Sequence, residues 1–152
     1  MNDKAKVHFA VLQDEDGYPP YSTESVWATR SEGGLYRIDN IPFFAREATM
    51  GDCVSVDERN GELWFVDVVK ASGDSLLRVV IFDESRTKDV RKELSDLRCR
   101  QEFFATHQLI AVSVPETVDL EDVMTLLRSY SDDEVLDYEA PLLRHRESGS
   151  NE

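Results

Sequence analysis

The chain is poor in basic residues. Its 152 residues include 17 Lys and Arg against 31 Asp and Glu, which gives a formal net charge of −14. Nucleic acids and anionic membranes both attract positive charge, so neither is expected as a partner. The acid excess suits a basic protein partner, because complementary charge speeds encounter and helps to exclude wrong partners. Solubility alone would also account for it.

Long apolar runs and paired cysteines are missing as well. No run approaches the roughly 18 apolar residues of a membrane span, and no charged-then-apolar leader follows Met1. A cytoplasmic location is therefore expected. Cys53 and Cys99 lie far apart and form no C-x-x-C pair, so in a reducing compartment they are most simply buried thiols.

Motifs for catalysis or cofactor binding are also absent. His8, His107 and His145 are scattered, which argues against a zinc or metalloprotease site. There is no G-x-S-x-G nucleophile turn and no glycine-rich phosphate loop before a helix. We expect no metal, no cofactor and no enzymatic activity. His107 on an expected strand is the one candidate for a general base, and a hydrogen-bonded sheet histidine is the simpler interpretation.

The first half of the chain contains short strands separated by turn residues. Alternating apolar residues predict strands at 7–12, 25–30 and 35–38, with hairpin spacing that favours antiparallel pairing. Asn60-Gly61 suits a type I′ turn between two β-rich runs. The following strand, 63–69, is apolar on both faces and is expected to be covered on both sides. Residues 1–75 are thus expected to form an antiparallel β-sheet or half-barrel.

The periodicity changes after Phe82. Thr87 is a candidate cap for a helix, and Asp119 is a candidate cap for a second one. From residue 76 to 143 the expected order is strand, helix, strand, strand, helix, strand, which is that of a ferredoxin-like sandwich. The expected organisation is therefore a single α+β domain over residues 1–143, followed by a flexible tail at 144–152.

Charge is unevenly distributed in this second half. Residues 86–100 carry more bases than acids, but Glu93 and Asp96 interrupt the basic run and weaken the case for nucleic-acid binding. Residues 116–139 are strongly acidic. A solvated helix face is the plain explanation, and contact with a basic partner is the sharper one. The candidate partner-binding residues are Glu116, Asp119, Glu121, Asp122, Asp132, Asp133, Glu134, Asp137 and Glu139.

The stretch from Tyr36 to Val56 is expected to form a corner around which the first half is arranged. The residue before Pro42 must be extended, and Phe43-Phe44 are expected to anchor the corner in the core. Asp39, Asn40 and Asp52 lie beside these aromatic residues and could line a small-ligand pocket. The alternative is that all three bind nearby backbone in turns.

This corner also carries a resemblance to a known family. The ordered pattern W-x8-YRIDNIPFF-x6-GD-x-V-x-V-x6-LWFV resembles the uncharacterised bacterial domain-of-unknown-function family 4265, and the likeness covers roughly residues 7–143. The resemblance implies a compact α+β domain of cytoplasmic bacterial origin. It brings no established activity and transfers no catalytic residue. The matching residues are Trp27, Tyr36, Asp39, Asn40, Pro42, Phe43, Gly51 and Asp52.

Two function classes follow from the sequence. The first is a non-catalytic acidic binding protein, most concretely an immunity protein or antitoxin that neutralises a cognate toxin enzyme by direct binding. Its partner would be a basic protein such as a toxin domain, with no role for nucleic acid or membrane. The second class is a small-ligand-binding protein or enzyme with a pocket near Asp39, Asn40 and Asp52. The sequence does not indicate an oligomeric state.

Overall fold

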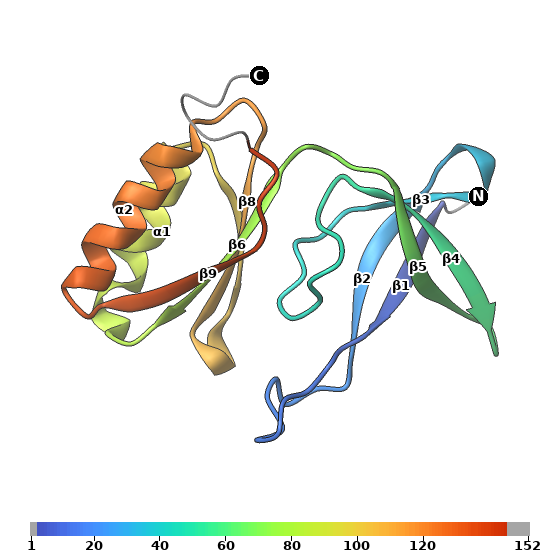
Figure 1. Cartoon of the computed structure of the whole chain (residues 1–152), viewed down its shortest axis with the longest axis horizontal. Helices are drawn as coiled ribbons and strands as arrows, with labels where there is room; N and C mark the ends of the chain where they lie inside the picture. The colour runs from blue at the N-terminus through green and yellow to red at the C-terminus, as the bar shows by residue number, and fades with distance from the viewer. Residues whose placement is uncertain (1–2, 146–152) are drawn as a thin grey trace. The chain divides into compact units, whose positions relative to one another are not determined.

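A computed structural model describes residues 3–145 of the chain. The chain divides into two compact units, residues 1–72 and 73–152 (Figure 1). The first unit is built from strands, and the second combines a sheet with two α-helices. The protein is therefore a mixed α+β chain, as the sequence predicts.

The first unit is a closed five-stranded barrel with the strands in sequence order. Closure corrects the expectation of an open antiparallel sheet or half-barrel: β1 pairs antiparallel with β2 but parallel with β5, where Val7 lies opposite Leu63. The parallel contact gives both edge strands a partner, and edges left open would invite pairing with other chains. The strands are β1 Lys4–Ala10, β2 Thr23–Arg30, β3 Tyr36–Ile38, β4 Cys53–Arg59 and β5 Glu62–Lys70.

Alternating side chains fill the barrel. Val7, Phe9 and Val54 are at most 1% exposed, and the Phe9 ring stacks on Phe65 with centroids 4.8 Å apart. The opposite face of β5 is open, since Val66 is 48% exposed. The expectation that this strand is covered on both sides is therefore wrong, because an apolar run does not by itself show that a second layer exists.

Two turns in the barrel are stabilised in different ways, one by its own residues and one by a side chain from another strand. Asn60 and Gly61 have φ values of 53° and 82°, the positive angles that a type I′ hairpin turn requires, so this prediction is confirmed. The corner after β3 is held by Glu24 of β2, whose carboxylate accepts hydrogen bonds from the backbone N–H groups of Phe43, Phe44 and Ala45 at 2.6, 2.9 and 2.8 Å. Phe44 is 8% exposed and anchors the corner as expected.

The second unit is a four-stranded antiparallel sheet in the order β7-β8-β6-β9. Both helices lie on the same face of this sheet (Figure 1). Val90 and Leu94 of α1 and Val123 and Leu127 of α2 are fully buried there in one apolar cluster. The elements are β6 Ser75–Ile81, α1 Thr87–Asp96, β7 Arg100–Phe104, β8 Leu109–Val114, α2 Leu120–Asp132 and β9 Leu136–Leu142.

The two helix starts differ. Asp119 caps α2 as predicted, because its carboxylate accepts the N–H of Glu121 at 3.0 Å. Thr87 is the first residue of α1 and its side chain makes no capping bond, so the predicted cap there is wrong. A short 3-10 turn, Glu84–Arg86, precedes the helix and is itself capped by Asp83, which accepts the N–H of Ser85.

The chain leaves β9 through a buried anchor. The backbone N–H groups of Arg144 and His145 donate to Ser75 Oγ at 2.9 and 3.2 Å. The His145 ring bridges Ser75 Oγ and the carbonyl of Pro115 at 2.7 and 2.8 Å. The beginning of the expected tail is thus held in place, and residues 146–152 lie outside the described part. Neither helix within residues 3–145 is long and apolar enough to cross a bilayer.

Candidate functional site

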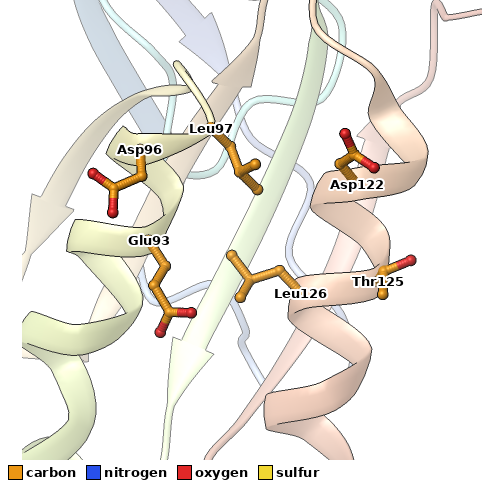
Figure 2. A pocket seen from close by; sticks show the side chains of 6 residues that line it. All are labelled: Glu93, Asp96, Leu97, Asp122, Thr125 and Leu126. Atoms are coloured by element: carbon orange, nitrogen blue, oxygen red, sulfur yellow. The ribbon is translucent and has the colours of Figure 1, made fainter.

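A groove runs between α1 and α2 on the helical face of the second unit. It has a volume of about 460 Å³. Figure 2 shows Leu97 and Leu126 pointing toward one another across the gap, with Asp96 and Thr125 on the outer flanks. The groove thus combines an apolar floor with an acidic rim. Its lining residues are Glu93, Asp96, Leu97, Asp122, Thr125 and Leu126.

Helical spacing places these side chains in two matching rows. Glu93 of α1 and Leu97, the residue that caps the end of α1, are four residues apart, and Asp122 and Leu126 have the same spacing on α2. Residues at this spacing share a helix face, so one carboxylate and one leucine from each side line the space between the helices (Figure 2). Because both helices pack on the same face of the sheet, the two rows border a common space.

Tyr130 fixes the carboxylate of Glu93. The phenolic hydroxyl of Tyr130 donates to Glu93 Oε2, and the Arg86 guanidinium lies 5.3 Å from the centre of the same ring. Burial, together with the hydrogen bond and negative charge of Glu93, raises the pKa of Tyr130. The phenol therefore stays protonated at neutral pH and holds the carboxylate at the groove.

The other two carboxylates are held differently. Asp96 pairs with Lys92 on the outer side of α1 at 3.0 Å. Asp122 lies in the first turn of α2, where the N-terminal end of the helix dipole favours negative charge. The six lining residues include no cation. This arrangement suits a lysine or arginine side chain, whose aliphatic part would lie on the leucines while its charged end meets the carboxylates.

The structure separates the acidic residues that the sequence groups together. Glu116, Asp119, Glu121 and Asp122 lie around the start of α2, whereas Asp132, Asp133 and Glu134 lie at its end, about 20 Å away for a helix of this length. Asp137 and Glu139 alternate with Leu136 and Tyr138 along β9 and so lie on the sheet face opposite the helices. Of the nine candidates, Asp122 alone lines the groove.

Sequence reasoning missed Glu93 and Asp96, which it treated as interruptions of a basic run, and it missed the two leucines. The repeated acid and leucine spacing on both helices is a signal that could have found them. This spacing indicates a groove only if the two helices are neighbours. The order of the strands in the sheet decides this, and the sequence of either helix alone does not.

A second groove lies on the barrel. It measures about 460 Å³ and is lined by Lys4, Trp27, Asp39 and Asn40. Asn40 Oδ1 accepts the N–H of Trp27 at 2.7 Å, and Asp39 Oδ2 accepts hydrogen bonds from Lys4 and from Thr29 at 2.9 and 2.6 Å. Trp27 is 48% exposed. Two of the three residues predicted for a small-ligand pocket are therefore brought together beside a tryptophan.

Asp52 does not join that groove. It is fully buried, and its carboxylate accepts the N–H groups of Thr49 at 3.0 Å and Ser72 at 2.9 Å. These bonds tie the end of the corner to the end of the barrel. Gly51 beside it has φ 88°, and a Cβ there would lie 2.9 Å from Ser72 Cβ, so glycine is required. The structure places Asp52 in the framework.

The remaining candidates for chemistry have structural surroundings. His107 ends a 3-10 turn rather than lying on a strand, and its ring packs nearly perpendicular to the ring of Phe104 with centroids 4.8 Å apart. Burial raises the pKa of Cys99 to about 11, so its thiol stays protonated, and Cys53 is half-buried. Within residues 3–145, no three His, Cys, Asp or Glu side chains are grouped to hold a metal ion.

Two arginines at α1, Arg86 and Arg91, contact neighbouring side chains. Arg91 Nε donates to Gln101 Oε1 at 2.9 Å, and the guanidinium lies 5.2 Å from the centre of the Phe103 ring. Arg86 pairs with Asp89 at 3.1 Å. These contacts hold the basic side chains against α1 and β7.

Comparison with known proteins gives a family and a fold. The chain resembles a solved structure described as "Novel crystal structure of a hypothetical protein from Neisseria gonorrhoeae", with a TM-score of 0.81 and 21% identity over 96% of this chain and 99% of that one. At this identity the likeness concerns the fold alone. No curated protein matches the chain. The model of the domain of unknown function DUF4265 matches residues 24–138, so the chain belongs to the DUF4265 family.

Proposed function

We propose that this chain is a non-catalytic binding protein for a basic protein partner, and that the groove between α1 and α2 receives a lysine or arginine side chain of that partner. One observation carries the proposal: carboxylates from both helices line the groove together with Leu97 and Leu126, with no cation among its lining residues.

The estimated free energy of the contacts in the groove favours a protein partner over a small cation. An exposed ion pair contributes about 0.5 kcal/mol, and burial of a methylene group contributes about 0.8 kcal/mol. Two such pairs, with Glu93 and Asp122, and a partly buried lysine stem amount to about 3 kcal/mol, which corresponds to a dissociation constant of several millimolar. A single side chain is therefore held too weakly for function alone. Useful affinity requires the larger contact surface of a folded partner.

The most specific form of the proposal is an immunity protein or antitoxin that covers the active site of a cognate toxin enzyme. The net charge of −14 supports it, because enzymes that act on nucleic acids carry basic surfaces that this charge would attract. We also assign the second unit to the ferredoxin-like sandwiches, on the basis of its βαββαβ order and its antiparallel sheet order β7-β8-β6-β9.

The groove is tested with defined peptides. The isotope-labelled chain is titrated with a tetrapeptide that carries one lysine and with the same peptide carrying norleucine, which keeps the stem and removes the charge. We expect only the lysine peptide to cause NMR chemical-shift changes, and we expect these changes to be confined to residues that line the groove. The double variant Glu93→Gln, Asp122→Asn should not show them. Equal responses to the two peptides, or responses spread over the whole acidic surface, would contradict the proposal.

The toxin-neutralising form has its own test. The product of the neighbouring gene is expressed alone and together with this chain. We expect the product alone to stop growth, co-expression to restore it, and purified chain to inhibit the enzyme at a one-to-one ratio. The toxin-neutralising form would be wrong if the neighbouring gene had a housekeeping role and this chain remained monomeric when mixed with the product of that gene.

The barrel groove favours a second candidate function, the binding of a small ligand. Its supporting observation is the exposed indole of Trp27 beside Asp39 and Asn40. Asp39→Ala and Trp27→Ala are compared by thermal melting and by ligand-induced stabilisation with a metabolite panel. A binding site predicts that a ligand stabilises the wild type and that both variants lose this stabilisation, whatever their own melting temperatures. A framework role for Asp39 predicts a lowered melting temperature and no ligand response in the wild type either.

A further inference from the structure

The connection between β1 and β2 projects beyond the ends of the other barrel strands (Figure 1). Its side chains are unusually apolar for such a position. Leu12 is 93% exposed and Tyr18 is 57% exposed. Leu12 buries almost no surface and so contributes little to folding. Tyr18 packs edge-on against Phe44, with ring centroids 6.5 Å apart, but most of its surface is still exposed. These two side chains therefore call for an explanation outside the barrel.

The loop is ordered by its own hydrogen bonds. Asp14 Oδ1 accepts the N–H groups of Asp16 and Tyr18, both at 2.9 Å, and the N–H of Asp14 donates to the carbonyl of Tyr18 at 2.7 Å. Gln13 Nε2 donates to the carbonyl of Pro19 at 3.0 Å. The base is closed by the N–H of Val11, which donates to the carbonyl of Ser22 at 2.8 Å. The exposed side chains are thus presented on a fixed backbone.

The chemistry of the loop is that of a contact surface. Tyrosine supplies a large rigid contact area at a low entropy cost, and a loop already held in shape loses little freedom on binding. Three exposed acids, Asp14, Glu15 and Asp16, lie between Leu12 and Tyr18. The surface therefore pairs apolar anchors with concentrated negative charge.

We propose that this loop is a second contact of the protein and that Leu12 and Tyr18 enter an apolar pocket with a basic rim on the protein partner. Charge complementarity selects this occupant: the three acids oppose an anionic membrane and repel a second copy of an acidic chain. The partner is the basic protein of the proposed function, so the inference rests on that proposal for the identity of the partner. The loop belongs to the barrel unit and shares no residue with the groove of the second unit.

The first part of the test locates the contact. The photo-crosslinking residue p-benzoylphenylalanine replaces Tyr18 in the full chain, which is expressed in the organism that encodes it. The control places the same residue at Val66, a barrel position with 48% exposure. We expect an adduct at position 18 and none at position 66, with a strongly basic protein, of isoelectric point above about 9, in the adduct. An adduct with a second copy of this chain, or equal labelling at both positions, would overturn the inference.

The second part measures the energetics with the partner so identified. Isothermal titration calorimetry is carried out with the wild type and two double variants. The loop variant carries Leu12→Ser and Tyr18→Ser, and the groove variant carries Glu93→Gln and Asp122→Asn. We expect the loop variant to bind at least tenfold more weakly while it remains folded, with a melting temperature lowered only by the lost contact between Tyr18 and Phe44. Tyr18→Phe keeps that ring contact and is the control for stability. An unchanged affinity of the loop variant would overturn the inference. If only the groove variant binds the partner more weakly, the proposed function stands and the loop inference is wrong. If only the loop variant binds more weakly, the loop inference stands and the groove is not the binding site.

Discussion

At the scale of single residues, carboxylates in this protein serve two different purposes. Asp52 and Glu24 accept backbone N–H groups and hold the corner after β3, whereas Glu93 is held by Tyr130 at the rim of a groove. The first kind satisfies buried donors, and the second kind presents charge. An acidic residue therefore has to be assigned from its partners, because composition does not distinguish the two purposes.

Glu24→Gln tests the first purpose. Glutamine keeps the length of the side chain but replaces one acceptor oxygen with an NH₂ group, which opposes the three backbone N–H donors of Phe43, Phe44 and Ala45. We expect the free energy of unfolding to fall by about 2 kcal/mol, measured by urea denaturation. The control is Glu58→Gln, an exposed residue of β4, which should change it by less than about 0.5 kcal/mol. Equal effects of the two changes would show that Glu24 does not hold the corner.

The pKa of Asp39 predicts how the stability of the protein depends on pH. Burial opposes its ionisation, but hydrogen bonds from Thr29 and Lys4 and the charges of Lys4 and Arg37 outweigh it and hold the pKa of Asp39 below its usual 3.8. A carboxyl group with a lowered pKa in the folded state stabilises the protein fully above its unfolded pKa. That contribution is lost as the pH falls through the lower folded value.

The wild type should therefore exceed Asp39→Asn in stability most at neutral pH, and the difference should shrink as the pH falls below 3.8. Urea denaturation of both proteins between neutral pH and pH about 2.5 measures it, and carbon-13 titration of the carboxyl group gives the folded pKa directly. A difference that does not change with pH would mean that the charge of Asp39 adds nothing to folding.

At the scale of elements, the two helices end in the same way without glycine. Arg98 and Glu134 follow the ends of α1 and α2 with φ values of 71° and 61°. After them, the N–H of Cys99 donates to the carbonyl of Leu94 and that of Val135 donates to the carbonyl of Tyr130, both at 3.0 Å. This is the bonding pattern of a Schellman motif, whose left-handed position favours glycine.

Glu134→Gly should therefore stabilise the protein. Glycine adopts a positive φ without strain, so we expect the free energy of unfolding to rise by about 0.5 kcal/mol or more, measured by urea denaturation. The neighbouring Asp133→Gly is the control: its φ is −89°, so glycine there relieves no strain and should destabilise. Both changes remove one acidic charge. A gain in both variants would point to relief of charge repulsion rather than to the backbone.

The elements also show which features of the fold could be predicted from the sequence. Asn60-Gly61 and Asp119 were predictable because each acts within a few residues of chain, and so was the order of helices and strands after residue 76. The parallel contact of β1 with β5 was not, because alternation within β1 does not identify its second neighbour. Glu93 reaches the groove through Tyr130 of another helix, and no local pattern contains that contact.

At the scale of the whole molecule, the net charge of −14 acts over a longer range than any groove. On the function proposed above, this charge attracts every basic protein weakly, and the groove then selects among them by short-range fit. Salt separates these contributions, because the screening length falls from about 10 Å at 0.1 M to about 3 Å at 1 M while close contacts are screened much less. The association rate should therefore depend on salt more strongly than the dissociation rate.

Two variants of equal charge make this measurable. One carries Glu93→Gln, Asp96→Asn and Asp122→Asn in the groove, and the other neutralises three exposed acids of the barrel unit, Glu32, Glu58 and Asp67. With the cognate basic protein, surface plasmon resonance between 0.05 M and about 0.5 M NaCl should show that both variants lower the association rate to a similar degree, because each loses the same charge. The groove variant alone should also speed dissociation, by about tenfold, since it alone removes short-range contacts. Equal dissociation rates in the two variants would mean that the partner is held by net charge and that the groove between α1 and α2 is not its binding site.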